Sequence, residues 1–277
     1  MTRRPRSRLP PKLPDPAREA APRAARGPST RERLKTARVS GRSVAFGSTE
    51  IVSLMRRVAR NDRAALLGCP AFEGITLAQV QSTMADVYGW DGDGPRPRIA
   101  GSRTVEGFTA ASERVLEVAS DGGRIAFATT CPASLFTVHR ALAAAADAAG
   151  GKVFEAAESA PFDERSRDAA RLRWLDRVAM VTDGHTLPGD ARAPGLAAEE
   201  LAFTIGHPDL VVADRTFAGH AIASGVEVVA FAGLDALALA VAAWRGLAVR
   251  VVPLDERRPP GAYEPLVELV DQLHPGA

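Results

Sequence analysis

The sequence predicts an α/β fold, a parallel Rossmann-like (doubly wound) sheet with an N-terminal helical cover. In residues 121–277, short apolar runs alternate with segments of helical spacing, an order typical of a parallel sheet with crossover helices. In residues 30–120 the pattern is mostly helical, so we expect this part to pack over one face or edge of the sheet. We therefore divide the folded chain into a helical part, residues 30–120, and a Rossmann-like core, residues 121–277.

Residues 124–156 form the clearest unit of this core. An apolar run ends at Thr129 and Thr130, and Pro132 suits the first turn of a helix, where its missing N–H costs nothing. Apolar residues then recur at helical spacing until a glycine pair at 150–151 precedes a second apolar run. The unit predicts strand, helix and strand. In a parallel sheet its first turn lies at the carboxyl ends of the strands, where a helix N-terminus attracts anions.

The remaining elements follow from the same patterns. Further helices are expected over residues 30–39, from residue 49 onward, and over 75–87, 104–118, 197–205, 215–224, 234–244 and 263–273. Further strands are expected over residues 174–182, 210–213, 227–231 and 248–253. Residues 163–173 are polar and charged and predict a loop or a short surface helix.

Residues 1–29 are expected to be a disordered tail rich in Arg and Pro. Residues 1–33 contain ten Lys and Arg against three acidic residues, a net charge of +7, which leaves 25 against 30, or −5, for residues 34–277. Because phosphate contacts need basic side chains, the acidic body does not favour nucleic acid as a partner. Only the tail could bind nucleic acid, and we regard a dispensable tail as the better interpretation.

The composition also indicates the cellular compartment. Two cysteines are too few for a disulfide framework or a structural zinc site. The basic N-terminus is not followed by the apolar core of a signal peptide, and no apolar run reaches the roughly 18 residues of a membrane span. We expect a cytoplasmic protein without a membrane partner. The oligomeric state does not follow from the sequence.

Acidic residues mark the ends of several predicted strands. Asp183 and Asp214 each follow an apolar run directly, Asp235 lies a few residues beyond another, and His185 follows Asp183 closely. Parallel strands would bring these side chains to one edge of the sheet, beside the hydroxyls of the first turn. Carboxylates gathered there are suited to hold Mg²⁺ or Mn²⁺, which can bridge to a phosphate.

The same residues also allow a purely structural interpretation. Asp214 can cap the helix that follows it, as strand-to-helix turns often require, and Thr130 can cap the helix that begins near Pro132. A single histidine in a loop, such as His185, is often simply exposed. His220 is a weaker outside candidate for proton transfer.

Several stretches of the chain resemble a bacterial family that is labelled simply "phosphatase". They are ATTCPASL at residues 128–135, VTDGHTL at 181–187, the long segment 208–242, and VVPLDERRPPGAYEPL at 251–266. The resemblance extends over about residues 30–273. In the family pattern the first turn is often T-G-H-P, so Cys131 stands where a histidine is expected. His185, Asp214, Asp235 and Arg258 match the pattern.

Together, the resemblance and the strand ends favour a phosphatase-like hydrolase of a small-molecule phosphomonoester, assisted by a divalent metal. The expected catalytic residues are His185, Asp214 and Asp183. The expected metal ligands are Asp183, Asp214 and Asp235, with Mg²⁺ or Mn²⁺ as the cofactor. The expected substrate-binding residues are Thr129, Thr130, Ser134 and Arg258. A small phosphorylated substrate is the expected partner.

A non-catalytic module that binds a phosphorylated metabolite or a nucleotide in the same crevice is the alternative. The presence of Cys131 at the histidine position favours it, because loss of a catalytic histidine would remove turnover and leave binding. The sequence leans toward an enzyme but leaves both possibilities open.

Overall fold

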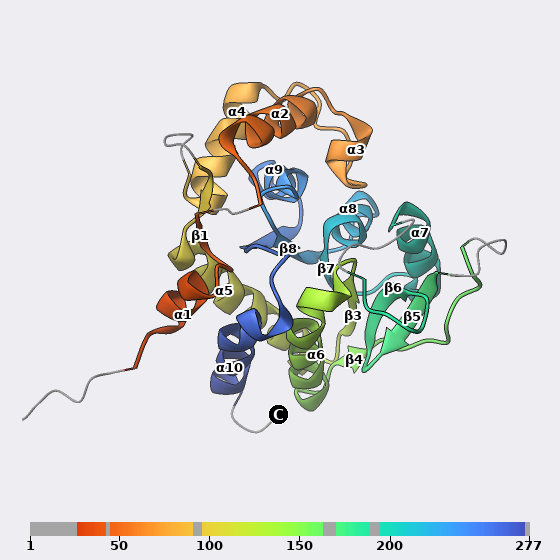
Figure 1. Ribbon diagram of the computed structural model, residues 1–277. Helices are drawn as coiled ribbons and strands as arrows, with labels where there is room; N and C mark the ends of the chain where they lie inside the picture. The colour runs from red at the N-terminus through yellow and green to blue at the C-terminus, as the bar shows by residue number, and fades with distance from the viewer. Residues whose placement is uncertain (1–26, 43–44, 91–95, 163–169, 189–193, 275–277) are drawn as a thin grey trace, which may run out of the picture.

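The computed structural model describes residues 27–42, 45–90, 96–162, 170–188 and 194–274 (Figure 1). The expectation of a disordered tail therefore falls largely on residues 1–26, outside the described part. At the centre lies a seven-stranded sheet in the order β5-β6-β3-β7-β8-β9, with β4 paired to the start of β3. Its strands are β3 (Arg124–Thr129), β4 (Lys152–Val153), β5 (Arg171–Leu175), β6 (Val178–Thr182), β7 (Leu210–Asp214), β8 (Val228–Ala232) and β9 (Val249–Pro253).

The sheet is parallel except at one edge, which confirms an α/β class with a mostly parallel sheet. Strands β3, β4, β6, β7, β8 and β9 run in one direction. The single strand expected over residues 174–182 is wrong, because β5 and β6 form an antiparallel hairpin. Its two turn residues, Asp176 and Arg177, both have positive φ, 45° and 66°. A turn with both central residues in the left-handed region suits a two-residue hairpin, and neither residue is the usual glycine or asparagine.

Side chains alternate along the central strands and divide the core into two halves. In β3, Ile125 and Phe127 belong to one buried cluster, whereas Ala126 and Ala128 belong to the other. Small residues on the second face allow helices to pack close to the sheet. The first half is covered by α1 (Thr30–Thr36), α5 (Gly101–Ser120), α6 (Pro132–Ala148) and α10 (Glu264–Leu273). The second is covered by α2 (Ser48–Ala59), α3 (Arg63–Leu66), α4 (Leu77–Thr83), α7 (Pro194–Ile205), α8 (Arg215–Ala223) and α9 (Leu237–Trp244).

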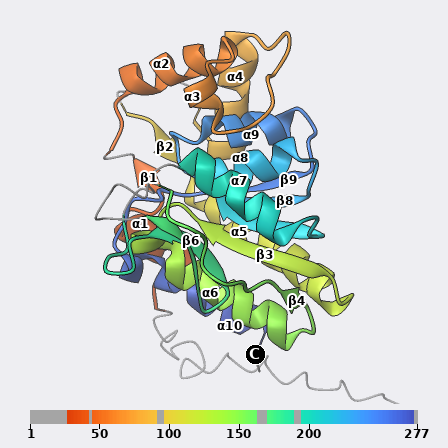
Figure 2. The same cartoon turned by 90° about the vertical axis from the view of Figure 1, so that its right-hand side faces the viewer.

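The helices of residues 30–120 contribute to both halves instead of forming a single cover. Figure 2 shows α2, α3 and α4 beyond α9 on one side of the sheet, while α1 and α5 lie on the other side. A short π-helical turn, η2 (Met84–Tyr88), ties the first group to the sheet, since the Tyr88 hydroxyl donates to the Gly233 carbonyl oxygen at 2.9 Å. A two-stranded ribbon of β1 (Gly41–Arg42) and β2 (Arg98–Ile99) completes this region, and η3 (Pro260–Tyr263) precedes α10.

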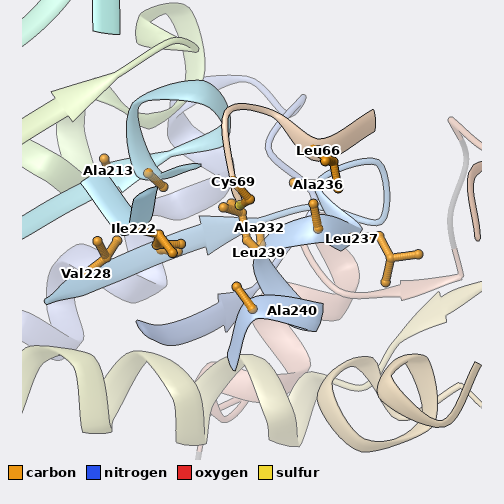
Figure 3. Close-up of a cluster of buried hydrophobic side chains, with 14 of the residues drawn as sticks. Leu66, Cys69, Ala213, Ile222, Val228, Ala232, Ala236, Leu237, Leu239 and Ala240 are labelled. Carbon is orange, nitrogen blue, oxygen red and sulfur yellow. The ribbon is translucent and has the colours of Figure 1, made fainter. Parts of the chain in front are cut away.

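The segment after α3 packs against strand β8 and helices α8 and α9. Figure 3 shows Leu66 and Cys69 in the same apolar cluster as Ala232 of β8 and Leu237 of α9. A Cβ atom added at Gly219 of α8 would lie 2.0 Å from the Leu67 carbonyl oxygen, so this close approach requires glycine. The contact fixes α3 next to α8. In the described part of the chain, no helix combines the length and the apolar character needed to cross a bilayer.

Candidate functional site

The carboxyl ends of the central strands meet at a buried carboxylate, Asp214. Its side chain is 0% exposed and accepts hydrogen bonds from the Thr129 hydroxyl, the Thr130 amide at 2.8 Å and the Thr130 hydroxyl at 2.5 Å. The donors are the last residue of β3 and the first residue of the turn between β3 and α6. Among the described residues, no side-chain bond from Asp214 caps α8, so the capping interpretation is wrong for this residue. Asp214 instead joins the ends of two adjacent strands.

Behind this carboxylate lies a buried histidine, His139 of α6. Its Nε2 lies 3.8 Å from Oδ2 of Asp214, and its ring packs edge-on against Phe231 with centroids 5.0 Å apart. Neither ring nitrogen has a hydrogen-bond partner among the described residues. Burial raises the pKa of Asp214, but the nearby imidazole and the hydroxyls of Thr129 and Thr130 outweigh it and hold the pKa below its usual value. The carboxylate is therefore ionised at neutral pH.

Arg215 follows Asp214 directly and begins α8 in a left-handed conformation, with φ 43°. Its Nη1 lies 2.7 Å from Oδ2 of Asp235 and 3.5 Å from Oε2 of Glu256. Arg257 also donates to Asp235, at 2.8 Å. Burial lowers the pKa of Arg215, yet the charges of Glu256 and Asp235 raise it further, so the guanidinium stays protonated. A non-glycine residue with positive φ is uncommon outside functional sites and turns.

The second buried carboxyl group of this network is Glu256, in the loop after β9. It is 2% exposed, and its Oε1 accepts the Gly233 amide at 2.6 Å. Burial raises the pKa of Glu256 to about 8, against the opposing charge of Arg215. Glu256 therefore carries a proton over much of the neutral range and lies within reach of Arg215.

A cavity of about 560 Å³ opens beside this network. It is lined by Thr130 from the first turn, Arg215 and His220 from α8, Arg63 from α3 and Glu199 from α7, together with apolar residues of the segment after α3. Its basic side chains outnumber its single carboxylate, so the cavity favours an anion. Its volume is sufficient for a small metabolite.

Asp183 and His185 lie elsewhere, in the turn after β6. Asp183 accepts the backbone amides of His185 at 2.8 Å and Thr186 at 2.9 Å, and these bonds lower its pKa. His185 is exposed. The described bonds of the Asp183 carboxylate thus stay within its own turn and do not join the network of Asp214.

The three carboxylates expected to bind metal have separate partners. Asp183 is bonded within its turn, Asp214 by hydroxyls and an amide, and Asp235 by two arginines. Among the described residues, no group of three or more His, Cys, Asp and Glu side chains is arranged to hold a metal ion. The residues as placed do not fit a three-carboxylate Mg²⁺ or Mn²⁺ site, and a metal requirement stays a prediction.

The N-terminus of α6 is filled by the protein itself, contrary to the expected phosphate site there. The Cys131 amide donates to the Thr129 hydroxyl at 3.0 Å, and the Ala133 amide to the Pro188 carbonyl at 3.3 Å. The Ser134 hydroxyl donates to the Glu256 carbonyl oxygen at 2.6 Å. Of the three hydroxyl residues expected to bind phosphate, only Thr130 lines the cavity.

The substrate-binding candidate Arg258 and the residue at the family's histidine position, Cys131, also lie outside the cavity lining. Arg258 pairs with Asp255, its Nε 2.9 Å from Oδ2, and its amide donates to the Tyr263 hydroxyl. Cys131 is buried, and burial together with Asp214 raises the pKa of its thiol far above the usual range. The residue at the expected histidine position is thus a protonated thiol and not a nucleophile.

Sequence reasoning assigned no site role to Arg63, His139, Arg215 and Glu256. One signal was visible, since Arg215 directly follows Asp214 and begins the next predicted helix. His139 lies within a predicted helix, and nothing in the sequence distinguished it as a site residue. Arg63 gave no signal, because it reaches the cavity only through the packing of α3 on α8.

A larger cavity of about 820 Å³ lies between α6 and α10. It is lined by ion-pairing residues of the β5–β6 turn, such as Asp176 and Arg177, and by Arg140. It contains none of the strand-end residues. The smaller cavity at the carboxyl ends of the strands is therefore the better candidate, because ligands of parallel sheets bind there.

Comparison with known proteins agrees with the resemblance seen in the sequence. The sequence model of a family described as Phosphatase matches residues 26–273. The chain is also 32% identical over 244 residues to the protein named Phosphatase SCO2771 from Streptomyces coelicolor, an alignment that covers 85% of this chain and 91% of that protein. The match confirms the predicted family.

Proposed function

The chain belongs to the Phosphatase family, and from this premise we propose that it hydrolyses a small-molecule phosphomonoester in the cavity beside Arg215. The observation that supports this proposal is the convergence of Arg215, Arg63 and Thr130 on one cavity at the carboxyl ends of the parallel strands. These residues come from α8, α3 and the turn after β3, so only the folded chain brings them together.

Arg215 is the proposed phosphate anchor. A phosphoryl group in transfer carries its negative charge on oxygen atoms, and positioned cations stabilise that charge. The contacts of Arg215 with Asp235 and Glu256 fix the guanidinium before substrate arrives. Arg63 of α3 supplies a second positive charge at the same cavity.

His220 is the proposed proton donor to the leaving oxygen. It lines the cavity, whereas His185 is exposed in the turn after β6. Histidine is the usual residue for proton transfer near neutral pH. We therefore assign to His220 the role that the sequence favoured for His185.

Assistance by Mg²⁺ or Mn²⁺ stays a prediction and is included as a variable in the assay. The test is a phosphate-release assay over sugar phosphates, nucleotides and amino-alcohol phosphates, with Mg²⁺, with Mn²⁺ and with a chelator. We expect release from at least one ester by the wild type and a strong loss in Arg215→Met. Arg103→Met is the matched control, because Arg103 lies on α5 in an exposed pair with Glu106. Equal rates in Arg215→Met and the wild type would remove Arg215 from the proposal.

A second function, binding of a phosphorylated ligand without turnover, is favoured by one observation. Cys131 occupies the expected histidine position as a buried, protonated thiol. Thermal stabilisation by a phosphate ester, without phosphate release over the whole panel, would support this function instead.

A further inference from the structure

The hydrogen bonds around Asp214 fix the direction of the Thr130 hydroxyl. An ionised carboxylate only accepts hydrogen bonds, so the hydroxyl hydrogens of Thr129 and Thr130 both point to Asp214. The Thr130 amide points to the same carboxylate. The hydroxyl hydrogen of Thr130 is thus already donated to Asp214, and only the lone pairs of the hydroxyl oxygen can interact with other partners.

This orientation changes what Thr130 can do at the cavity that it lines. The oxygens of a phosphate dianion are acceptors and gain nothing from another lone pair. A water molecule, in contrast, can donate a hydrogen to the Thr130 oxygen and keep its own lone pair free for attack on phosphorus. Thr130 is therefore better placed to hold the attacking water than to hold the phosphate, which the arginines can bind.

His139 supports the same arrangement from behind. It is buried, and its Nε2 lies 3.8 Å from the Asp214 oxygen that also accepts the Thr129 hydroxyl. Of the other ionisable groups near this turn, Cys131 belongs to the turn itself, Glu256 lies in the loop after β9 and Arg215 begins α8. Burying the Asp214 carboxylate between the His139 imidazole and the Thr130 hydroxyl costs free energy of folding. We therefore expect this arrangement to serve a function.

We propose that Thr130, Asp214 and His139 form a relay that orients the attacking water, with Thr130 contacting the water and Asp214 and His139 as positioning residues. This inference rests on the proposed phosphomonoester hydrolysis. The water oxygen forms the new bond to phosphorus while the bond to the leaving oxygen breaks, and that oxygen takes the proton of His220. One water proton moves to Thr130 as the Thr130 proton moves to Asp214. After the product leaves, the proton returns from Asp214 through Thr130 to water in the cavity, and His220, which also lines the cavity, regains a proton from solvent.

The decisive variant is Thr130→Val, tested with the best substrate of the panel. We expect kcat to fall about 100-fold while KM, and the Kd of inorganic phosphate, stay within about twofold. Thr130→Ser keeps the hydroxyl and should restore most of kcat. The matched control is Thr137→Val on α6, because its hydroxyl is buried without a hydrogen-bond partner among the described residues. It should leave kcat unchanged.

His139→Gln supplies an independent test should Thr130→Val fail to fold, as its melting temperature will show. We expect His139→Gln to lower kcat about tenfold with KM unchanged, since its role is to position. Equal kcat for Thr130→Val and the wild type, or a rise in KM alone, would overturn the relay and leave the phosphatase proposal standing. A wild type that binds phosphate but hydrolyses no ester would overturn both.

Discussion

Asp214 and Asp183 look alike in the sequence and differ completely in the structure. Each stands at the end of an apolar five-residue strand, β7 or β6. Asp214 is fully buried and accepts three hydrogen bonds from the neighbouring strand-end turn, whereas the Asp183 carboxylate closes its own exposed turn. The difference shows that an acidic strand end becomes a site only where neighbouring strands supply partners.

Position in the sheet explains this difference. Strand β7 is central, between β3 and β8, so its end faces two strand-to-helix turns. Strand β6 lies next to the edge strand β5, and its end leads into a loop. The last residue of the central strand β7 therefore lies in a crowded, desolvated environment, whereas the residue that follows the near-edge strand β6 lies in a turn open to solvent.

The largest effect on activity is expected from Asp214→Asn. The amide loses the negative charge and turns a donor toward one of the hydroxyls, so the free energy of unfolding should fall by about 2–3 kcal/mol. Turnover should fall by about 100-fold or more. Urea unfolding and phosphate release measure the two effects. Asp183→Asn is the matched control, and equal losses in both variants would contradict the distinction drawn between the two strand ends.

Arg215→Met should give the next largest effect. Loss of a charged donor to the phosphate costs about 1.5–3 kcal/mol of binding, or roughly a 10- to 100-fold rise in KM. The steady-state kinetics of the best substrate measure it. A pure loss of folded protein without any change in KM would assign Arg215 to the Asp235 and Glu256 network alone.

Glu256→Gln should change how the free energy of unfolding depends on pH. The sign of this change distinguishes the buried Glu256 from Asp183 in its exposed turn. The folded-state pKa of Glu256 is raised from 4.5 to about 8, so its contribution to stability is complete below pH 4.5 and is lost as the pH rises to about 8. Across this window the wild type should lose up to about 1.4 kcal/mol per pH unit relative to the variant. Urea unfolding at pH 5 and pH 8.5 checks this. The pKa of Asp183 is lowered, so its small contribution has the opposite sign and is lost as the pH falls.

The smallest effect is expected from His185→Ala, at the exposed strand end. Surface substitutions away from special features usually change free energies by about 0.5 kcal/mol or less, so the hydrolysis rate should stay within about twofold of the wild type. Initial rates at neutral pH measure it. A tenfold loss would return the proton-transfer role from His220 to His185.

The predictable part of the site was its location and some of its side chains, Thr130 and Asp214 among them. The apolar run before Thr129 and Pro132 after it predicted the strand-to-helix turn at which Thr130 meets the cavity. The β5–β6 hairpin was missed because Arg177 stands at the second turn position, where glycine usually signals such a turn after an aspartate such as Asp176. Arg63 was missed because α3 reaches the cavity only by packing on Gly219.

The sequence alone determined the family, the alternation of strands and helices, and the edge of the sheet at which polar residues collect, because periodicity and short motifs are local properties of the chain. Only the tertiary structure decided which of these residues act together. Burial, hydrogen-bond direction and pKa depend on neighbours that are distant in the chain, and for that reason Asp214, His139 and Glu256 are buried while His185 is exposed.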